Sequence, residues 1–173
     1  MASSLIKIDK EIVSSAVSSV TLTGIDSTYD VYLLVINNMH PSVANSNLGI
    51  RVTEGGTANT TSNYDNAAKF LRTASSFGNS SNTNQDKFGV GSYIGAGDTG
   101  DRAVGVHYIF NASNSSEYTF ITHERVQTAE SNEMTGEQGG GVFTVASAVD
   151  GVHIFISSGN METGTFTLYG LKK

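Results

Sequence analysis

Apolar and polar side chains alternate along several short stretches of this chain. The clearest alternation lies near the C-terminal end, where residues 152–157 and 165–169 place an apolar side chain at every second position. Successive side chains of a strand point to opposite faces of a sheet, so this period of two predicts two half-buried strands. Asp150-Gly151 favours a turn before the first strand, and residues 159–164 connect the two. We expect this pair to close one sheet of a β-sandwich near the end of the chain.

Other stretches carry the same signal or a continuous apolar run. Residues 29–38 are the most continuous apolar stretch, which predicts a central strand covered on both faces. Residues 103–111 and 117–125 have matching lengths and predict a hairpin. Residues 12–22 also fit a helical spacing of four, but their Ser and β-branched residues favour a strand. Shorter strands are expected at residues 47–53 and 88–94.

Between these strands lie three long stretches rich in Ser, Thr, Asn, Gln and Gly. They cover residues 54–66, 74–87 and 127–141, and their composition predicts surface loops. The second is too polar to bury itself, so we expect it to be mobile or to be ordered by a neighbouring subunit. With about nine or ten short strands and no convincing helix, the chain is expected to be all-β, a two-sheet sandwich of jelly-roll type.

Length and composition fit one domain of this class. At 173 residues the chain can bury its own core, and we expect a single β-sandwich domain over 1–173 whose N-terminal segment, 1–22, is extended. The net charge of −6 argues against general nucleic-acid binding, which depends on neutralising phosphates. The absence of cysteine excludes disulfides and thiolate metal sites. No apolar run approaches the roughly 20 residues of a membrane helix, so no membrane insertion is expected.

The four histidines are scattered along the chain and are expected to pack in the core or on the surface. They are His40, His107, His123 and His153, and none stands in the HxH or HExxH spacing of a metal site. A zinc or iron site would require distant strands to bring them together. We therefore expect no metal and no cofactor.

Acidic residues in the predicted loops are the other candidates for chemistry. Asp98 and Asp101 stand in a glycine-rich turn and could offer carboxylates to Ca²⁺, but a calcium loop gathers more oxygen ligands, so turn formation is expected. Two carboxylates could also hydrolyse a glycoside. The acids considered for that role are Asp98, Asp101, Glu124, Glu130, Glu133 and Glu137. Nothing in the sequence selects a pair, so we assign no catalytic residue and expect no enzyme.

Both ends of the chain resemble small virion proteins of tailed bacteriophages, of the type found in phages of marine bacteria and cyanobacteria. The resemblance lies in the strand at 29–38 with the following Pro41-Ser42 and Leu48-Gly49-Ile50-Arg51-Val52-Thr53, and in Asp150-Gly151-Val152, Ser158-Gly159-Asn160 and Gly164-Thr165-Phe166-Thr167-Leu168-Tyr169-Gly170. Such proteins are regarded as tail-fibre-like or capsid-associated structural proteins with jelly-roll-like sandwiches. They have no catalytic motif, and residues 74–87 and 127–141 match nothing in their pattern.

The resemblance implies a non-enzymatic virion protein made in the host bacterial cytoplasm. Because the chain is short and has no fibrous repeat, we expect a compact capsid decoration or cement protein, or a neck or tail adaptor. Its partners would be copies of itself, as a homotrimer, and other virion proteins such as major capsid or tail and neck proteins. The alternative is a receptor-binding or carbohydrate-binding module at a fibre tip, whose tyrosines would stack on a host-surface glycan. A polysaccharide-degrading enzyme is the third reading.

Overall fold

The structure is a computed structural model that describes residues 4–73, 77–89, 93–98, 100–129 and 132–172. All regular elements in these ranges are strands, and the thirteen strands pair in antiparallel fashion. The strands are β1 (Leu5–Val13), β2 (Ser19–Thr23), β3 (Val31–Pro41), β4 (Ser46–Glu54), β5 (Thr57–Ala58), β6 (Tyr64–Arg72), β7 (Gly78–Gln85), β8 (Tyr93–Ile94), β9 (Ala103–Phe110), β10 (Thr119–Thr128), β11 (Met134–Phe143), β12 (Gly151–Ile156) and β13 (Met161–Leu171).

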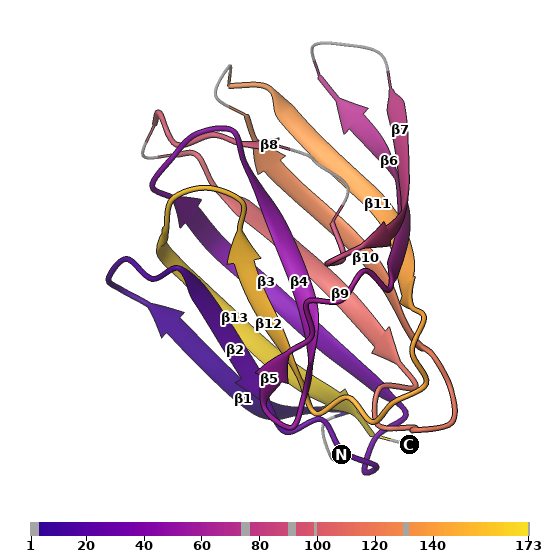
Figure 1. Ribbon diagram of the computed structural model, residues 1–173. Helices are drawn as coiled ribbons and strands as arrows, with labels where there is room; N and C mark the ends of the chain where they lie inside the picture. The colour runs from indigo at the N-terminus through magenta and orange to yellow at the C-terminus, as the bar shows by residue number, and fades with distance from the viewer. Residues whose placement is uncertain (1–3, 74–76, 90–92, 99, 130–131, 173) are drawn as a thin grey trace.

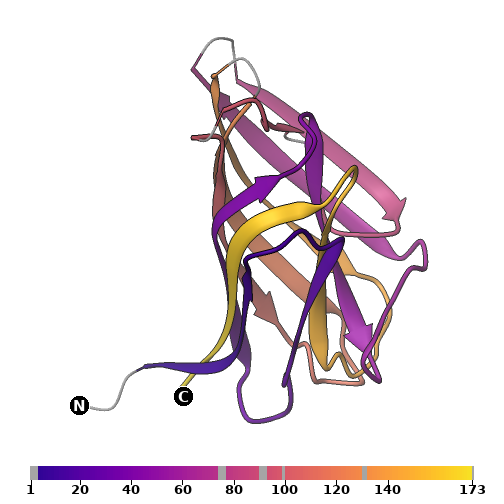
Figure 2. The same ribbon diagram turned by 90° about the vertical axis from the view of Figure 1, so that its left-hand side faces the viewer.

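The strands form two sheets of unequal width. The larger sheet has eight strands in the order β1-β13-β3-β9-β10-β11-β6-β7. The smaller has five, in the order β2-β12-β4-β5 with β8 paired to β4. Figure 1 shows the smaller sheet in front of the half of the larger sheet that contains β13 and β3, whereas β6 and β7 lie towards the other edge. In the side view of Figure 2 the sheets form two layers, and both chain ends lie at the same end of the molecule.

The alternation within the strands places the apolar core between the two sheets. The larger sheet contributes Leu34 and Ile36 of β3 and Phe166 of β13, and the smaller sheet contributes Val52 and Ile154, all at most 2% exposed. Burying each such side chain contributes about 1.5–3 kcal/mol to folding. The described chain is therefore all-β with a sandwich-like arrangement of two sheets, as the sequence predicted.

The predicted central strand and the predicted hairpin are confirmed. The apolar run at 29–38 forms most of β3, which lies between β13 and β9. On its outward side Leu33 is 7% exposed, but Val35 is only half-buried and Asn37 is exposed, so the strand is central in the sheet and is not covered on both faces as predicted. Strands β9 and β10 pair as the expected hairpin, with Phe110 opposite Phe120 and Ala103 opposite Gln127.

The prediction for the C-terminal strand pair is wrong in its placement. Strands β12 and β13 belong to different sheets, and neither is an edge strand, because β12 lies between β2 and β4 and β13 lies between β1 and β3. The turn at residues 157–160 carries the chain from one sheet to the other, helped by Gly159, whose φ of 72° favours glycine. Alternation specified which residues face the core, and it could not specify which sheet each strand joins.

The predicted strand count was too low, because polar stretches form strands. Residues 78–85 within the predicted loop 74–87 form β7, which pairs with β6. Its backbone hydrogen bonds need no apolar side chains, since it is an edge strand. Residues 74–76 of that loop lie outside the described residues. Residues 54–66 include β5 and the start of β6, and the stretch 12–22 is divided between β1 and β2.

The predicted loop at 127–141 is also mostly strand. It contains the end of β10 and residues 134–141 of β11. The glycines that indicated a loop are there because neighbouring backbones approach closely. A Cβ atom on Gly139 would lie 2.4 Å from the carbonyl oxygen of Ala67 and 2.6 Å from Cβ of Ala68.

Replacing Gly139 by alanine is expected to lower the free energy of unfolding by about 1–3 kcal/mol, because the backbones of β11 and β6 must separate to admit a methyl group. Gly100→Ala is the matched control, since nothing lies within 4 Å of a Cβ at Gly100. Urea unfolding of both variants measures the difference. Equal midpoints would show that β6 and β11 do not pack as closely as the structure has them.

Candidate functional site

The larger sheet carries many apolar side chains on the face that points away from the smaller sheet. We call this surface the outer face, and it comprises the outward side chains of β3, β9, β10, β11 and β6. Val126 is 46% exposed, Phe120 46% and Leu71 45%. Its larger apolar members include Val31, Leu33, Val35, Leu71, Val104, Val106, Tyr108, Phe110, Phe120, Val126 and Val142. Exposed apolar patches of this extent on a soluble protein mark surfaces that bind another molecule.

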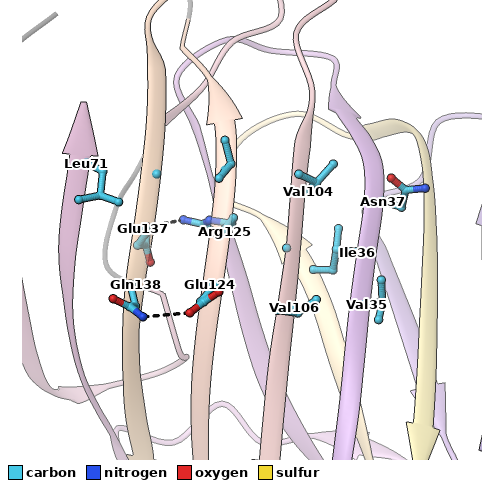
Figure 3. Close-up of a pocket in the computed structure, with 13 residues that line it drawn as sticks. Val35, Ile36, Asn37, Leu71, Val104, Val106, Glu124, Arg125, Glu137 and Gln138 are labelled. Carbon is cyan, nitrogen blue, oxygen red and sulfur yellow. Dashed lines mark hydrogen bonds and ion pairs between the residues drawn. The ribbon is translucent and has the colours of Figure 1, made fainter. Parts of the chain in front are cut away.

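The strand register aligns these side chains in rows across the sheet. Val126 lies opposite Val104 on β9 and opposite Gly136 on β11, and Gly136 lies opposite Leu71 on β6. Because Gly136 has no side chain, the surface sinks between Val126 and Leu71. The result is an open hollow of about 570 Å³, lined also by Val35 and other side chains shown in Figure 3.

A polar pair lies near the centre of the apolar outer face, and β6 adds the charged side chains of Asp65 and Lys69 towards one edge. Glu124 of β10 lies opposite Gln138 of β11, and Nε2 of Gln138 donates a hydrogen bond of 2.9 Å to Oε1 of Glu124. A second hollow of about 500 Å³ adjoins this pair and is lined by Tyr108, Thr122 and Gly139 among others. Among the outward residues of β3, β9, β10 and β11, Glu124 is the only carboxylate.

The opposite face of the same strands holds a buried group of ionisable side chains. We call it the His–Arg–Glu cluster, and it consists of His107 of β9, His123 and Arg125 of β10, and Glu137 of β11. These residues are 3%, 9%, 4% and 3% exposed, respectively. Nε2 of His123 donates to Oε1 of Glu137 at 2.8 Å, and an Nη atom of Arg125 donates to Oε2 at 2.7 Å. The rings of His107 and His123 stack with centroids 5.6 Å apart.

The cluster is closed to substrates. A void of only about 10 Å³ lies beside it, and Leu48, Ile50 and Phe88 cover it from the side of the smaller sheet. A ligand pocket usually needs some hundreds of Å³. The cluster can therefore hold protons and charges, but it cannot receive an organic substrate.

Burial sets the protonation of His107. Removal from water, followed by the nearby charges of His123 and Arg125, holds the pKa of His107 well below its ordinary value of 6.5, although Glu137 acts in the opposite direction. Its Nδ1 atom and Nε of Arg125 are buried and have no hydrogen-bond partner among the described residues. A neutral His107 is therefore part of the folded state at neutral pH.

The other two histidines lie apart from this cluster. Nδ1 of His40 is 3.2 Å from Oε2 of Glu162, and the side chain of Glu162 is 48% exposed whereas that of His40 is 15% exposed. Nδ1 of His153 is 2.9 Å from the hydroxyl of Thr21. No group of three or more His, Cys, Asp or Glu side chains within the described ranges could hold a metal ion.

The predicted loop acids take different roles. Asp101 is 2% exposed and accepts hydrogen bonds from the backbone N–H groups of Gly97 and Asp98, which confirms the prediction of turn formation. Glu137 does not lie in a surface loop, as the composition of residues 127–141 predicted, because it is buried in β11 and paired with Arg125. Glu130 lies outside the described residues.

The sequence reading missed both the outer face and the cluster. One signal was present in residues 119–128, where the polar residues His123, Arg125 and Gln127 recur at every second position and the apolar Phe120 and Val126 fall in the other set. An ordinary surface strand would turn the polar set outwards, but here it faces inwards and leaves Phe120 and Val126 exposed. His123 and Arg125 face inwards because Glu137 lies on the adjacent strand as their buried partner. Predicting this arrangement from the sequence would have required recognising β11 as a strand.

Comparison of the sequence with protein-family models and with curated proteins found no match. Among the described residues, no helix is long and apolar enough to cross a membrane.

Proposed function

We propose that this protein is a non-enzymatic structural subunit of a bacteriophage virion that assembles with copies of itself through the outer face. The apolar outer face is the observation that carries this proposal. The resemblance of both chain ends to small phage virion proteins supports the proposal that the assembly belongs to a virion. We propose a compact capsid decoration or cement protein, or a neck or tail adaptor, with a sandwich wound as a jelly roll.

The outer face is large enough for the centre of an interface. Its five strands, spaced about 4.8 Å apart, span roughly 19 Å, and eight residues rising about 3.3 Å each span roughly 26 Å. The projected face is thus roughly 500 Å², below the about 800 Å² per partner of a standard protein interface, so adjoining surface must complete the contact. Apolar side chains such as Val104, Tyr108 and Phe120 are suited to its dry centre.

The position of Glu124 favours a trimer over a dimer. Strand β10 is the fifth of eight strands, so Glu124 lies near the middle of the sheet. A two-fold axis through the middle of the face would bring two Glu124 carboxylates together, and like charges at an interface cost several kcal/mol. In a ring of three copies, each face meets a different surface of its neighbour, and this repulsion does not arise.

Cryo-electron microscopy of purified particles tests the proposed role. We expect density for three copies at a capsid, neck or tail position, with each outer face packed against a different surface of the neighbouring copy. Absence of the protein from purified particles would overturn the virion role, and a position with the outer faces exposed would overturn the proposed interface.

The second hollow supports one alternative, a carbohydrate-binding module. Tyr108 could stack on a sugar ring, and Glu124 and Gln138 could accept and donate hydrogen bonds to its hydroxyls. Isothermal titration of host-surface glycans against the protein tests this function. Binding that is lost in Tyr108→Ala would favour the carbohydrate-binding function, whereas no measurable binding to any of the host's glycans would rule it out.

A further inference from the structure

The His–Arg–Glu cluster and the outer face are built from the same strands. His107 stands between Val106 and Tyr108 on β9, and Arg125 stands between Glu124 and Val126 on β10. Each buried ionisable residue is thus flanked along the chain by side chains of the outer face. If the spacing among β9, β10 and β11 changes to accommodate an added charge in the cluster, the shape of the outer face must change as well.

The cluster has one carboxylate for three groups that can be positive. Glu137 uses Oε1 for His123 and Oε2 for Arg125. His107 stacks on His123 and has no carboxylate of its own within the cluster. The single negative charge of Glu137 is already matched by Arg125, so a positive charge on His107 has no carboxylate left in the cluster.

A proton on His107 would place an additional positive charge in a closed, water-poor site. His123 and Arg125 face it from β10, and Glu137 from β11 is already engaged. The remaining neighbours within the described part of the chain supply no countercharge. Leu34 lies opposite His107 on β3, and Leu48, Ile50, Phe88, Gly89 and Ile121 line the void beside the cluster. An uncompensated buried charge is strongly unfavourable, so the strands must separate to admit water.

We propose that the His–Arg–Glu cluster is an acid-sensitive switch, which keeps the outer face in its assembly-competent shape at neutral pH and releases that shape when His107 takes up a proton. This inference rests on the proposed function for the identity of the surface it controls. The switch itself is a property of the folded chain and can be tested without it.

The direction of the pH effect follows from the low affinity of the folded state for this proton. A histidine in the unfolded chain binds protons below about pH 6.5, whereas His107 in the folded chain does so only at lower pH. The stabilisation from a neutral His107 is therefore complete above pH 6.5 and is lost as the pH falls. For one proton, the folding equilibrium constant decreases by up to about tenfold per pH unit.

Two measurements between pH 8 and pH 5 test the switch, namely the urea unfolding midpoint and the mass by multi-angle light scattering. The wild type is expected to lose stability below pH 6.5 and to dissociate over the same range. His107→Gln cannot take up a proton at this position. Its free energy of unfolding is therefore expected to change with pH by one proton less than that of the wild type, and it is expected to remain assembled at lower pH. His107→Leu is the second variant if His107→Gln does not fold.

The outcomes separate the switch from the proposed function. An unchanged slope in both His107 variants would overturn the switch. A trimer that persists while the stability falls with the expected slope would overturn its control over assembly. A wild-type monomer at pH 8 would overturn the proposed function, and the slope comparison would still decide whether His107 is the group that responds to acid.

Discussion

Replacing Glu137 by glutamine is expected to lower the free energy of unfolding by about 3–5 kcal/mol, a large share of the stability of a small domain. The reason is the guanidinium group of Arg125, which is 4% exposed and has its partner in Oε2 of Glu137. Removing the carboxylate leaves this cation buried without a countercharge. Urea unfolding at pH 7.5 and one fixed protein concentration measures the loss, because assembly makes the midpoint depend on concentration.

A matched control and a rescue make this result specific. Glu162 is also paired with a histidine, His40, but the side chain of Glu162 is 48% exposed, and Glu162→Gln is expected to cost less than about 1 kcal/mol. Combining Glu137→Leu with Arg125→Met removes both charges, and this double variant should recover most of the stability lost by Glu137→Gln. Equal losses in Glu137→Gln and Glu162→Gln would contradict the buried ion pair.

Replacing Val126 by aspartate is expected to convert the assembled protein into monomers. Val126 is 46% exposed near the centre of the outer face, close to Glu124 on the same strand. A second carboxylate there must be desolvated in the interface, where it would stand beside the carboxylate of Glu124. We expect the apparent dissociation constant to rise by at least about a hundredfold, which corresponds to about 2.7 kcal/mol.

Val43→Asp is the control for this substitution. Val43 is 43% exposed, so the two valines are closely matched, but it lies in the turn between β3 and β4 and not on the outer face. Sedimentation at several protein concentrations compares the two variants, and thermal unfolding checks that both are folded. Dissociation caused equally by both substitutions would show that the added charge, and not its position on the outer face, weakens assembly.

Sequence patterns predicted the parts of the fold in which apolar alternation and burial coincide. The continuous apolar run of β3 indicated a central strand, and the matching lengths of β9 and β10 indicated their hairpin. Polar composition concealed β7, whose Ser, Thr and Asn side chains are solvated while its backbone pairs with β6. The glycines of β11 concealed that strand because they were interpreted as turn residues, whereas Gly139 provides close contact with Ala67 and Ala68.

The candidate sites were less predictable than the fold, because both depend on pairs of strands that are far apart in the sequence. Glu137 becomes a buried counterion only when β11 lies beside β10, and that pairing gives His123 and Arg125 a reason to face inwards. Their inward orientation in turn leaves Val126 and Phe120 outside. The outer face and the cluster are therefore two consequences of one register.

The solution mass of the wild-type protein at pH 8 tests the proposed assembly most directly. Multi-angle light scattering over a wide range of concentrations is expected to give three times the chain mass of 18.2 kDa, with Val126→Asp giving the mass of one chain. A wild type that remains at one chain mass at the highest concentration would contradict assembly through the outer face.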